Sequence, residues 1–133
     1  MTKVYLAVPL QKNRNNALAK NISNIILSLG CKIISEWVLW DNPNPNLNRH
    51  AIYKRNCEAI KSCELLIAEL SNPSIGVGME IMFAHSLGKK IICIYSHTEI
   101  SNMVKGLPDA ILLSYKNLDD LKEKLDQQFG IRS

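Results

Sequence analysis

The segment ELLIAELSNPSIGVGMEIMFAHSLGKKIICIY, residues 64–95, decides the fold of this chain. It opens with an apolar run at residues 64–70, continues after a loop into a mostly apolar helix predicted for residues 77–87, and ends in a second apolar run at residues 90–95. Strand, helix and strand in this order predict a parallel βαβ unit with a right-handed crossover. Because both strands are continuously apolar, we expect helices on both faces of their sheet.

The same alternation continues on both sides of this unit. Apolar residues at helical spacing and glycine stop signals indicate helices, and short β-rich apolar runs indicate strands. We predict strands at residues 3–8, 32–37 and 111–115, and helices at residues 17–29, 49–62, 99–105 and 118–129. Pro and Asn predict a loop at residues 41–48. The fold class is therefore α/β: a five-stranded parallel doubly wound sheet, flavodoxin-like or Rossmann-like, in one three-layer domain over residues 1–133.

Composition and charge exclude several classes of protein. The chain has 133 residues, of which 47% are hydrophobic and 21% charged, and its formal net charge is +4. No apolar run approaches the ~20 residues of a membrane span, and no signal-peptide pattern precedes the first strand, so we expect a cytoplasmic protein without a membrane partner. Lys and Arg form no basic stripe, which argues against binding a nucleic-acid polymer. The cysteines form no C-x-x-C pair, and we expect neither a metal nor an organic cofactor.

The sharpest chemical signal lies in NPSIGVGME, residues 72–80. Gly76 and Gly78 let the backbone approach a ligand, and the helix start that follows offers free N–H groups to an anion. The third glycine of the dinucleotide fingerprint and the Gly-Lys-Ser/Thr of a Walker loop are absent. Glu80 is a solitary charge in the predicted first turn of an apolar helix. It either complements the helix dipole or is buried for a catalytic purpose, since burying a carboxylate is costly.

The stretch AELSNPSIGVGMEI, residues 68–81, closely resembles the signature of 2'-deoxynucleoside 5'-phosphate N-hydrolases, within the nucleoside 2-deoxyribosyltransferase superfamily. The likeness continues in VYL at residues 4–6, LGKKIIC at residues 87–93 and SNMVKG at residues 101–106. The glycine loop with its glutamate is the specific part. The resemblance implies an N-glycosidase that acts on a nucleoside 5'-monophosphate, with a 2'-deoxynucleotide favoured over a ribonucleotide. It also implies at least a homodimer.

The resemblance also implies roles for individual residues. Glu80 falls on the family's nucleophile, which forms a glycosyl ester that water then releases. Ser74 stands where transferases acting on free nucleosides carry an aspartate, and a hydroxyl binds a phosphate without repelling it. Ser101 matches a phosphate contact from the neighbouring subunit, or is simply the N-cap of the next helix. Tyr5 matches a tyrosine near the sugar, or is a core aromatic of its strand.

The chain departs from the family pattern in two places. VPLQ at residues 8–11 replaces Gly-Ser-Ile-Arg, so either the affinity for phosphate is weaker or Lys12 or Arg14 supplies the lost charge. Arg14 suits bidentate phosphate binding, and it equally fits an exposed surface position. Asn56 replaces the family's aspartate that helps the base leave. An amide orients a base through hydrogen bonds but cannot deliver a proton.

Glu36, Asp41 and Glu69 are the candidate replacements for the missing acid. Each equally fits a solvated or salt-bridged carboxylate, and for Asp41 in its Pro/Asn loop that interpretation is the better one. Trp37 and Trp40 lie in the same region and could stack on a base, although tryptophans beside a strand are more often core or subunit contacts.

Three functions stay open at this point. The first is hydrolysis of a nucleoside 5'-monophosphate. The second is base exchange between deoxynucleosides, which Ser74 disfavours. The third is a nucleotide-binding module that has lost turnover, which Asn56 and the altered first loop would explain.

Overall fold

The computed structural model describes residues 1–10 and 16–129. The strands are β1 (Thr2–Ala7), β2 (Cys31–Ile33), β3 (Leu65–Glu69), β4 (Lys90–Tyr95) and β5 (Ile111–Ser114). The helices are α1 (Ala17–Ser28), α2 (Arg49–Ser62), α3 (Ile75–Ser86), α4 (Asn102–Lys105), α5 (Leu118–Phe129) and the 3-10 helix η1 (Glu36–Leu39). All strand pairs are parallel, in the order β2-β1-β3-β4-β5. This confirms the predicted doubly wound sheet and gives it the flavodoxin-like strand order.

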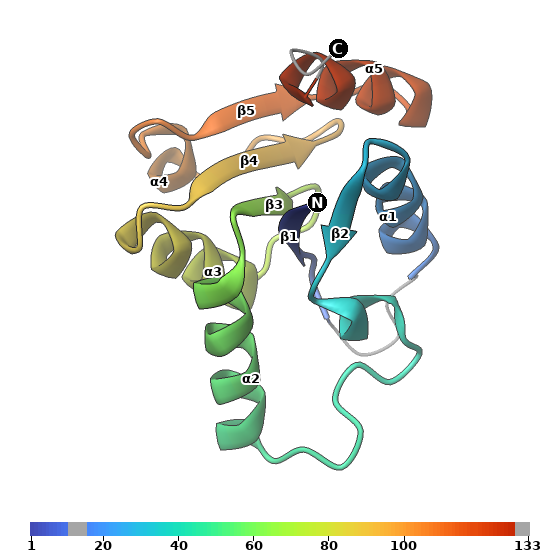
Figure 1. The fold of residues 1–133 in the computed structure, drawn as a ribbon. Coiled ribbons are helices and arrows are strands. Elements are labelled where there is room, and N and C mark those ends of the chain that lie inside the picture. Colours follow the sequence, from blue (N-terminus) through green and yellow to red (C-terminus); the bar gives the residue numbers. More distant parts are fainter. Residues whose placement is uncertain (11–15, 130–133) are drawn as a thin grey trace.

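Helices cover both faces of the sheet (Figure 1). On one face α1 contacts α5, and on the other α2 contacts α3. Every residue of the central strand β3 is buried, as its continuous apolar sequence requires. The largest fully buried side chains include Leu6, Ile22, Ile26, Leu66, Ile67, Ile92, Ile94 and Leu121.

The predicted strand at residues 32–37 is wrong in its second half. Strand β2 ends at Ile33, and the chain then turns into η1. The cause is Ser35, which is fully buried: its Oγ accepts a hydrogen bond from the Leu6 N–H at 2.9 Å and donates to the Leu6 carbonyl at 3.0 Å. A side chain thus satisfies the β1 backbone groups that a longer strand would have paired.

Helix α3 begins at Ile75, two residues before its predicted start, so Gly76 as well as Gly78 lies within the helix. Ser74 is the N-cap, and its Oγ accepts a hydrogen bond from the Val77 N–H at 3.2 Å. The earlier start places Glu80 in the second turn, whereas the first turn contains no acidic residue. Because the dipole effect fades beyond the first turn, it does not account for Glu80.

Three further observations concern the described part of the chain. None of its helices has the length and apolar character that a membrane span needs. None of the four cysteines, all within the described residues, forms a disulfide, and Cys31 and Cys93 are buried in β2 and β4 as small apolar side chains. Within residues 1–10 and 16–129, no group of three or more His, Cys, Asp or Glu side chains is arranged to hold a metal ion.

Candidate active site

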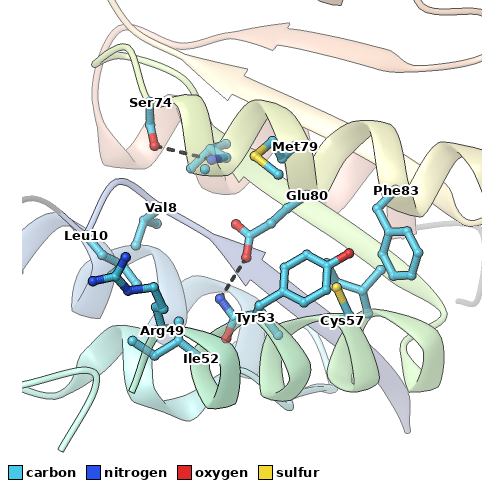
Figure 2. A pocket seen from close by; sticks show the side chains of 14 residues that line it. Val8, Leu10, Arg49, Ile52, Tyr53, Cys57, Ser74, Met79, Glu80 and Phe83 are labelled. Atoms are coloured by element: carbon cyan, nitrogen blue, oxygen red, sulfur yellow. Dashed lines mark hydrogen bonds between the residues drawn. The ribbon is translucent and has the colours of Figure 1, made fainter. Parts of the chain in front are cut away.

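A cavity of about 480 Å³, here called the Glu80 cavity, lies between α2 and α3 (Figure 2). Val8, directly after β1, contributes to its wall, so the cavity lies at the carboxyl end of the sheet, where doubly wound folds bind ligands. Most lining residues are apolar. The polar ones include Arg49, Asn56, Ser74 and Glu80.

The carboxylate of Glu80 points from α3 towards α2 (Figure 2). Its Oε2 accepts a hydrogen bond from the Tyr5 hydroxyl and another from Asn56 Nδ2, the latter at 3.2 Å. Burial raises the pKa of Glu80, while these hydrogen bonds and the charge of Arg55 lower it. Both donors bind Oε2, so neither occupies Oε1. A desolvated carboxylate held in a fixed direction is suited to nucleophilic attack.

Tyr5 is only 1% exposed and lies in the inner strand β1. The sequence left two interpretations of Tyr5, a core aromatic or a residue of the site, and the structure combines them. Its ring packs in the core, while its hydroxyl reaches Glu80. Burial, followed by the negative charge of Glu80, raises the pKa of the Tyr5 phenol. The phenol therefore keeps its proton and donates a hydrogen bond to the carboxylate.

Asn56 lies on α2 and uses both ends of its amide. Nδ2 donates to Glu80, and Oδ1 accepts a hydrogen bond from the Nε of Arg55 at 3.0 Å. The residue that replaces the family's aspartate is thus in direct contact with the predicted nucleophile. The sequence analysis did not single out Arg55, because its contacts come from parts of the chain that only the fold brings together.

The candidate substitute acids lie elsewhere. Glu36 and Asp41 are exposed, and Glu69 is 3% exposed and accepts a hydrogen bond from the Tyr115 hydroxyl at 2.5 Å. None of the three belongs to the described residues that line the Glu80 cavity. Glu69 thus has a partner at the end of the sheet, and none of these carboxylates takes the place of the missing aspartate at Asn56.

The tryptophans also differ from the base-stacking prediction. Trp37 is 8% exposed, with the Arg55 guanidinium carbon 4.0 Å from its ring centroid and the Tyr5 ring edge-on at 6.1 Å. Trp37 is therefore a core residue. Trp40 is 45% exposed, and neither tryptophan is among the described lining residues of the cavity.

Ser74 lies at the meeting point of two cavities. It lines the Glu80 cavity and also a second cavity of about 520 Å³ between α3 and α4, called here the α3–α4 cavity. Gly76 lines the first and Gly78 the second. A Cβ at Gly78 would meet no heavy atom within 4 Å, and one at Gly76 would only touch Ser74 Oγ at 3.9 Å. Glycine costs a helix about 1 kcal/mol relative to Ala, and packing within this chain does not require it at either position.

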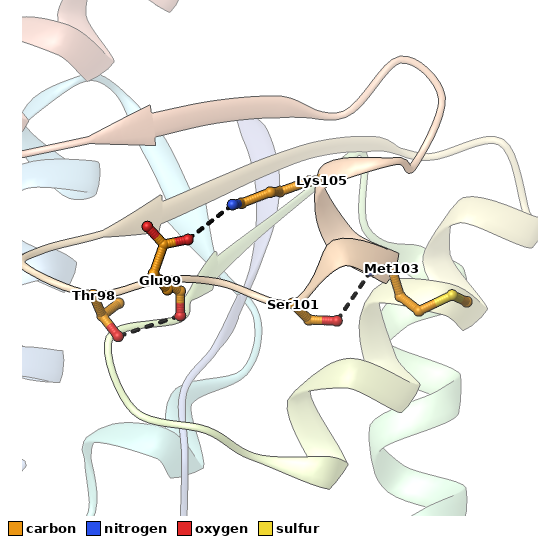
Figure 3. Close-up of polar contacts among 5 residues, drawn as sticks. All are labelled: Thr98, Glu99, Ser101, Met103 and Lys105. Carbon is orange, nitrogen blue, oxygen red and sulfur yellow. Dashed lines mark hydrogen bonds and ion pairs between the residues drawn. The ribbon is translucent and has the colours of Figure 1, made fainter.

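Ser101 is the N-cap of α4, where its Oγ accepts a hydrogen bond from the Met103 N–H at 3.1 Å (Figure 3). The capping interpretation is thus confirmed, and α4 is shorter than the predicted helix at residues 99–105. Ser101 lines the α3–α4 cavity but does not appear among the described residues of the Glu80 cavity. Its role as a phosphate contact stays a prediction.

Arg14 and Lys12, the predicted sources of positive charge, lie outside the described residues. The structure instead places Arg49, the first residue of α2, in the wall of the Glu80 cavity. Sequence reasoning missed Arg49. Its only signal was its position at the start of the helix that carries Asn56.

The chain is similar to proteins that act on nucleosides and nucleotides. A family model described as nucleoside 2-deoxyribosyltransferase matches residues 4–112. A Thermofilum pendens protein named "Putative 2'-deoxynucleoside 5'-phosphate N-hydrolase 1" is 30% identical over 93% of this chain and 92% of that protein. An Esox lucius 5-hydroxymethyl-dUMP N-hydrolase is 36% identical over 55% of this chain and 50% of its own. The structure of a Clostridium botulinum CMP N-glycosidase superposes with a TM-score of 0.74, at 26% identity, covering 96% of this chain and 99% of that one.

Proposed function

This chain belongs to the nucleoside 2-deoxyribosyltransferase family and is an N-glycosidase, and from this premise we propose that it hydrolyses nucleoside 5'-monophosphates to free base and (deoxy)ribose 5-phosphate. The observation that carries the proposal is the Glu80 carboxylate, directed into a cavity of about 480 Å³ and bound through Oε2 by Tyr5 and Asn56. The names of the Thermofilum and Clostridium relatives support a nucleotide as substrate.

Glu80 acts as the nucleophile in this proposal. Its carboxylate attacks the anomeric carbon, the N-glycosidic bond breaks with its electron pair going to the base nitrogen, and a glycosyl ester forms. Water then attacks the same carbon, the ester bond breaks, and Glu80 is regenerated as a carboxylate. The two protons of the water end on the sugar hydroxyl and on the base.

Asn56 orients the nucleophile and the base. Its NH₂ group carries two donors, of which one binds Glu80. We assign the second to an acceptor atom of the leaving base. Because an amide delivers no proton, the base takes its proton from water.

Ser74 and the start of α3 form the proposed phosphate site. Ser74 Oγ accepts its capping hydrogen bond from Val77, so its own hydroxyl proton is left for a phosphate oxygen. The N-terminal end of α3 favours an anion, and Arg49 brings a positive charge to the same cavity.

A panel assay tests this function. The protein is incubated with nucleoside and deoxynucleoside 5'-monophosphates and with the free nucleosides, and released base is measured by chromatography. We expect the monophosphates to release base with a far higher kcat/KM than the free nucleosides. Transfer of the sugar to an added acceptor base would support base exchange instead. Tight binding of a monophosphate without any product would indicate a nucleotide-binding module.

The pH dependence of the reaction follows from the surroundings of Glu80. Only the ionised carboxylate is nucleophilic, so kcat/KM falls as the pH decreases through the pKa of Glu80. Burial raises this pKa, and we expect the acid limb to have its midpoint above the ordinary value of 4.5. Tyr5→Phe removes a donor that lowers the pKa, which should move the limb to still higher pH.

Tyr115→Phe is the matched control for this measurement, because Tyr115 is also buried but donates its hydroxyl to Glu69. It should leave the midpoint unchanged. A wild-type midpoint at or below 4.5, or the same midpoint in Tyr5→Phe as in wild type, would contradict the expectation.

A homodimer completes the proposed site. Three apolar side chains of α3 and α4 that line the α3–α4 cavity are exposed: Ile75 (87%), Met82 (54%) and Met103 (81%). Exposed apolar surface of this kind marks an interface. Pairing through it would bury these residues and bring Ser101 of the partner subunit towards the phosphate.

We therefore expect Met82→Glu to convert the dimer to a monomer and to lower kcat/KM by about tenfold or more, since each site loses its partner. Light scattering after size-exclusion chromatography measures the mass. Leu27→Glu is the control, because Leu27 is 51% exposed but lies on α1, on the opposite face of the sheet. A wild-type monomer with full activity would refute the dimer.

A further inference from the structure

Arg55 connects α2 to the loop that precedes it. Its Nη1 donates to the Pro43 carbonyl and its Nη2 to Asn44 Oδ1, both at 2.8 Å. Its guanidinium carbon lies 4.0 Å from the centroid of the buried Trp37 ring, which is a cation–π geometry. The loop, η1 and α2 together therefore hold the guanidinium in one place, and its rigid fork fixes the direction of the remaining donor, Nε.

That donor determines which way the Asn56 amide faces. Nε of Arg55 donates to Asn56 Oδ1 at 3.0 Å, and Asn56 Nδ2 then donates to Glu80 Oε2 at 3.2 Å. Rotating the amide by half a turn would exchange its oxygen and its NH₂ group. A carbonyl oxygen would then face a carboxylate oxygen, two acceptors with no proton between them, in a largely desolvated place.

We propose that Arg55 is a positioning residue of the Glu80 site, whose Nε–H holds the Asn56 amide so that its NH₂ group binds the nucleophile. Arg55 does not touch the reacting atoms in this proposal; it acts through Asn56. An aspartate in place of Asn56 would instead pair with Arg55 as a carboxylate and place a second negative charge beside Glu80. The amide and the arginine thus work as a unit that supports one ionised carboxylate.

The direction of the electrostatic effects agrees with this geometry. The hydrogen bond from Asn56 and the charge of Arg55 both lower the pKa of Glu80 against the effect of burial. Other titratable or charged groups also surround the carboxylate, from β1 and from α2: Tyr5, Arg49, Tyr53 and Cys57. A test must therefore separate the orientation of the amide from the charge of the guanidinium.

Arg55→Lys makes this separation, because it keeps the charge but loses the planar fork and the Nε–H. We expect Arg55→Lys and Asn56→Leu each to lower kcat for base release by about tenfold, the effect of losing a hydrogen bond to a charged group. In the Asn56→Leu background, Arg55→Lys should change kcat by less than about twofold, since its partner is already gone. Equal losses in both backgrounds, or wild-type kcat in Arg55→Lys, would overturn the proposal.

Asn44→Ala controls for a purely structural role. It removes one loop contact of Arg55 and leaves the Nε bond to Asn56 intact. We expect kcat and the acid-limb midpoint to stay at wild-type values, because the Pro43 carbonyl and the Trp37 ring still hold the guanidinium. The same loss in Asn44→Ala as in Arg55→Lys would mean that Arg55 only holds the loop.

The inference rests on the proposed function, and a second readout separates the two. Titration of the Glu80 side chain by ¹³C NMR, assigned with Glu80→Gln, requires no substrate. Arg55→Lys should raise the pKa of Glu80, and Asn44→Ala should not. If the wild-type protein released no base while this shift was present, the proposed function would fail and the positioning role would stand. An unchanged titration in Arg55→Lys would refute the positioning role in either case.

Discussion

Replacing Glu80 by Gln is expected to lower kcat for base release by roughly 10³-fold or more, because the amide has the shape of the carboxylate but does not attack the anomeric carbon. The Gln side-chain oxygen still accepts hydrogen bonds from Tyr5 and Asn56, so the cavity should keep its shape. Substrate binding should therefore change little. A loss confined to kcat is the signature of a group that acts in the chemical step.

The measurement is chromatographic base release under saturating monophosphate, combined with mass spectrometry of acid-quenched protein. A mass increase equal to the sugar phosphate should appear in the wild-type protein and be absent in Glu80→Gln. Glu58→Gln, a change of the same kind at an exposed position of α2, serves as control and should retain full activity. If Glu80→Gln kept more than about a tenth of kcat, Glu80 would not be the nucleophile.

The second large effect is expected at Ser74. Ser74→Asp should lower kcat/KM for a nucleoside 5'-monophosphate by about 100-fold, because a carboxylate beside the phosphate repels it. Activity on the free nucleoside should stay equal or increase. Asp is as good an N-cap as Ser, so α3 should keep its first turn and the fold its stability.

This prediction is measured as the ratio of kcat/KM for a monophosphate to that for the matching nucleoside. Asn117→Asp is the control. Asn117 Oδ1 accepts from the Asp120 N–H at the start of α5, so this change adds the same charge to a similar contact on the other face of the sheet. The control should leave the ratio unchanged. A ratio that does not fall in Ser74→Asp would place the phosphate elsewhere.

Local patterns predicted most of the fold. Helices 49–62 and 118–129 and strand 90–95 have the predicted bounds, because periodicity and stop signals act over a few residues. The end of β2 was not predictable in this way, since it depends on the hydrogen bonds between Ser35 and Leu6, 29 residues apart in the sequence. Helix α3 was predicted to begin at residue 77, after Gly76, but capping by Ser74 starts it at Ile75.

The residues of the candidate site were likewise only partly predictable from the sequence. Resemblance pointed to Tyr5, Asn56 and Glu80, and the fold brings these three side chains into contact. It gave no indication of Arg55, because this residue has its role only when Trp37 and the loop before α2 fold against it. Ser101, in contrast, lies in the α3–α4 cavity, and its predicted role as a phosphate contact depends on the proposed homodimer.

Tyr5, which binds the nucleophile, is far more buried than the exposed side chains of the cavity wall. It belongs to the inner strand β1 and is 1% exposed, so it is as constrained as the core itself. Tyr53 and Met79, in contrast, line the Glu80 cavity and are 64% and 59% exposed. Substitutions at such exposed positions usually change stability by about 0.5 kcal/mol or less. In the proposed hydrolase, substitutions in this exposed wall can therefore change which base fits at little cost to the fold, whereas a substitution at Tyr5 disturbs the core and the site together.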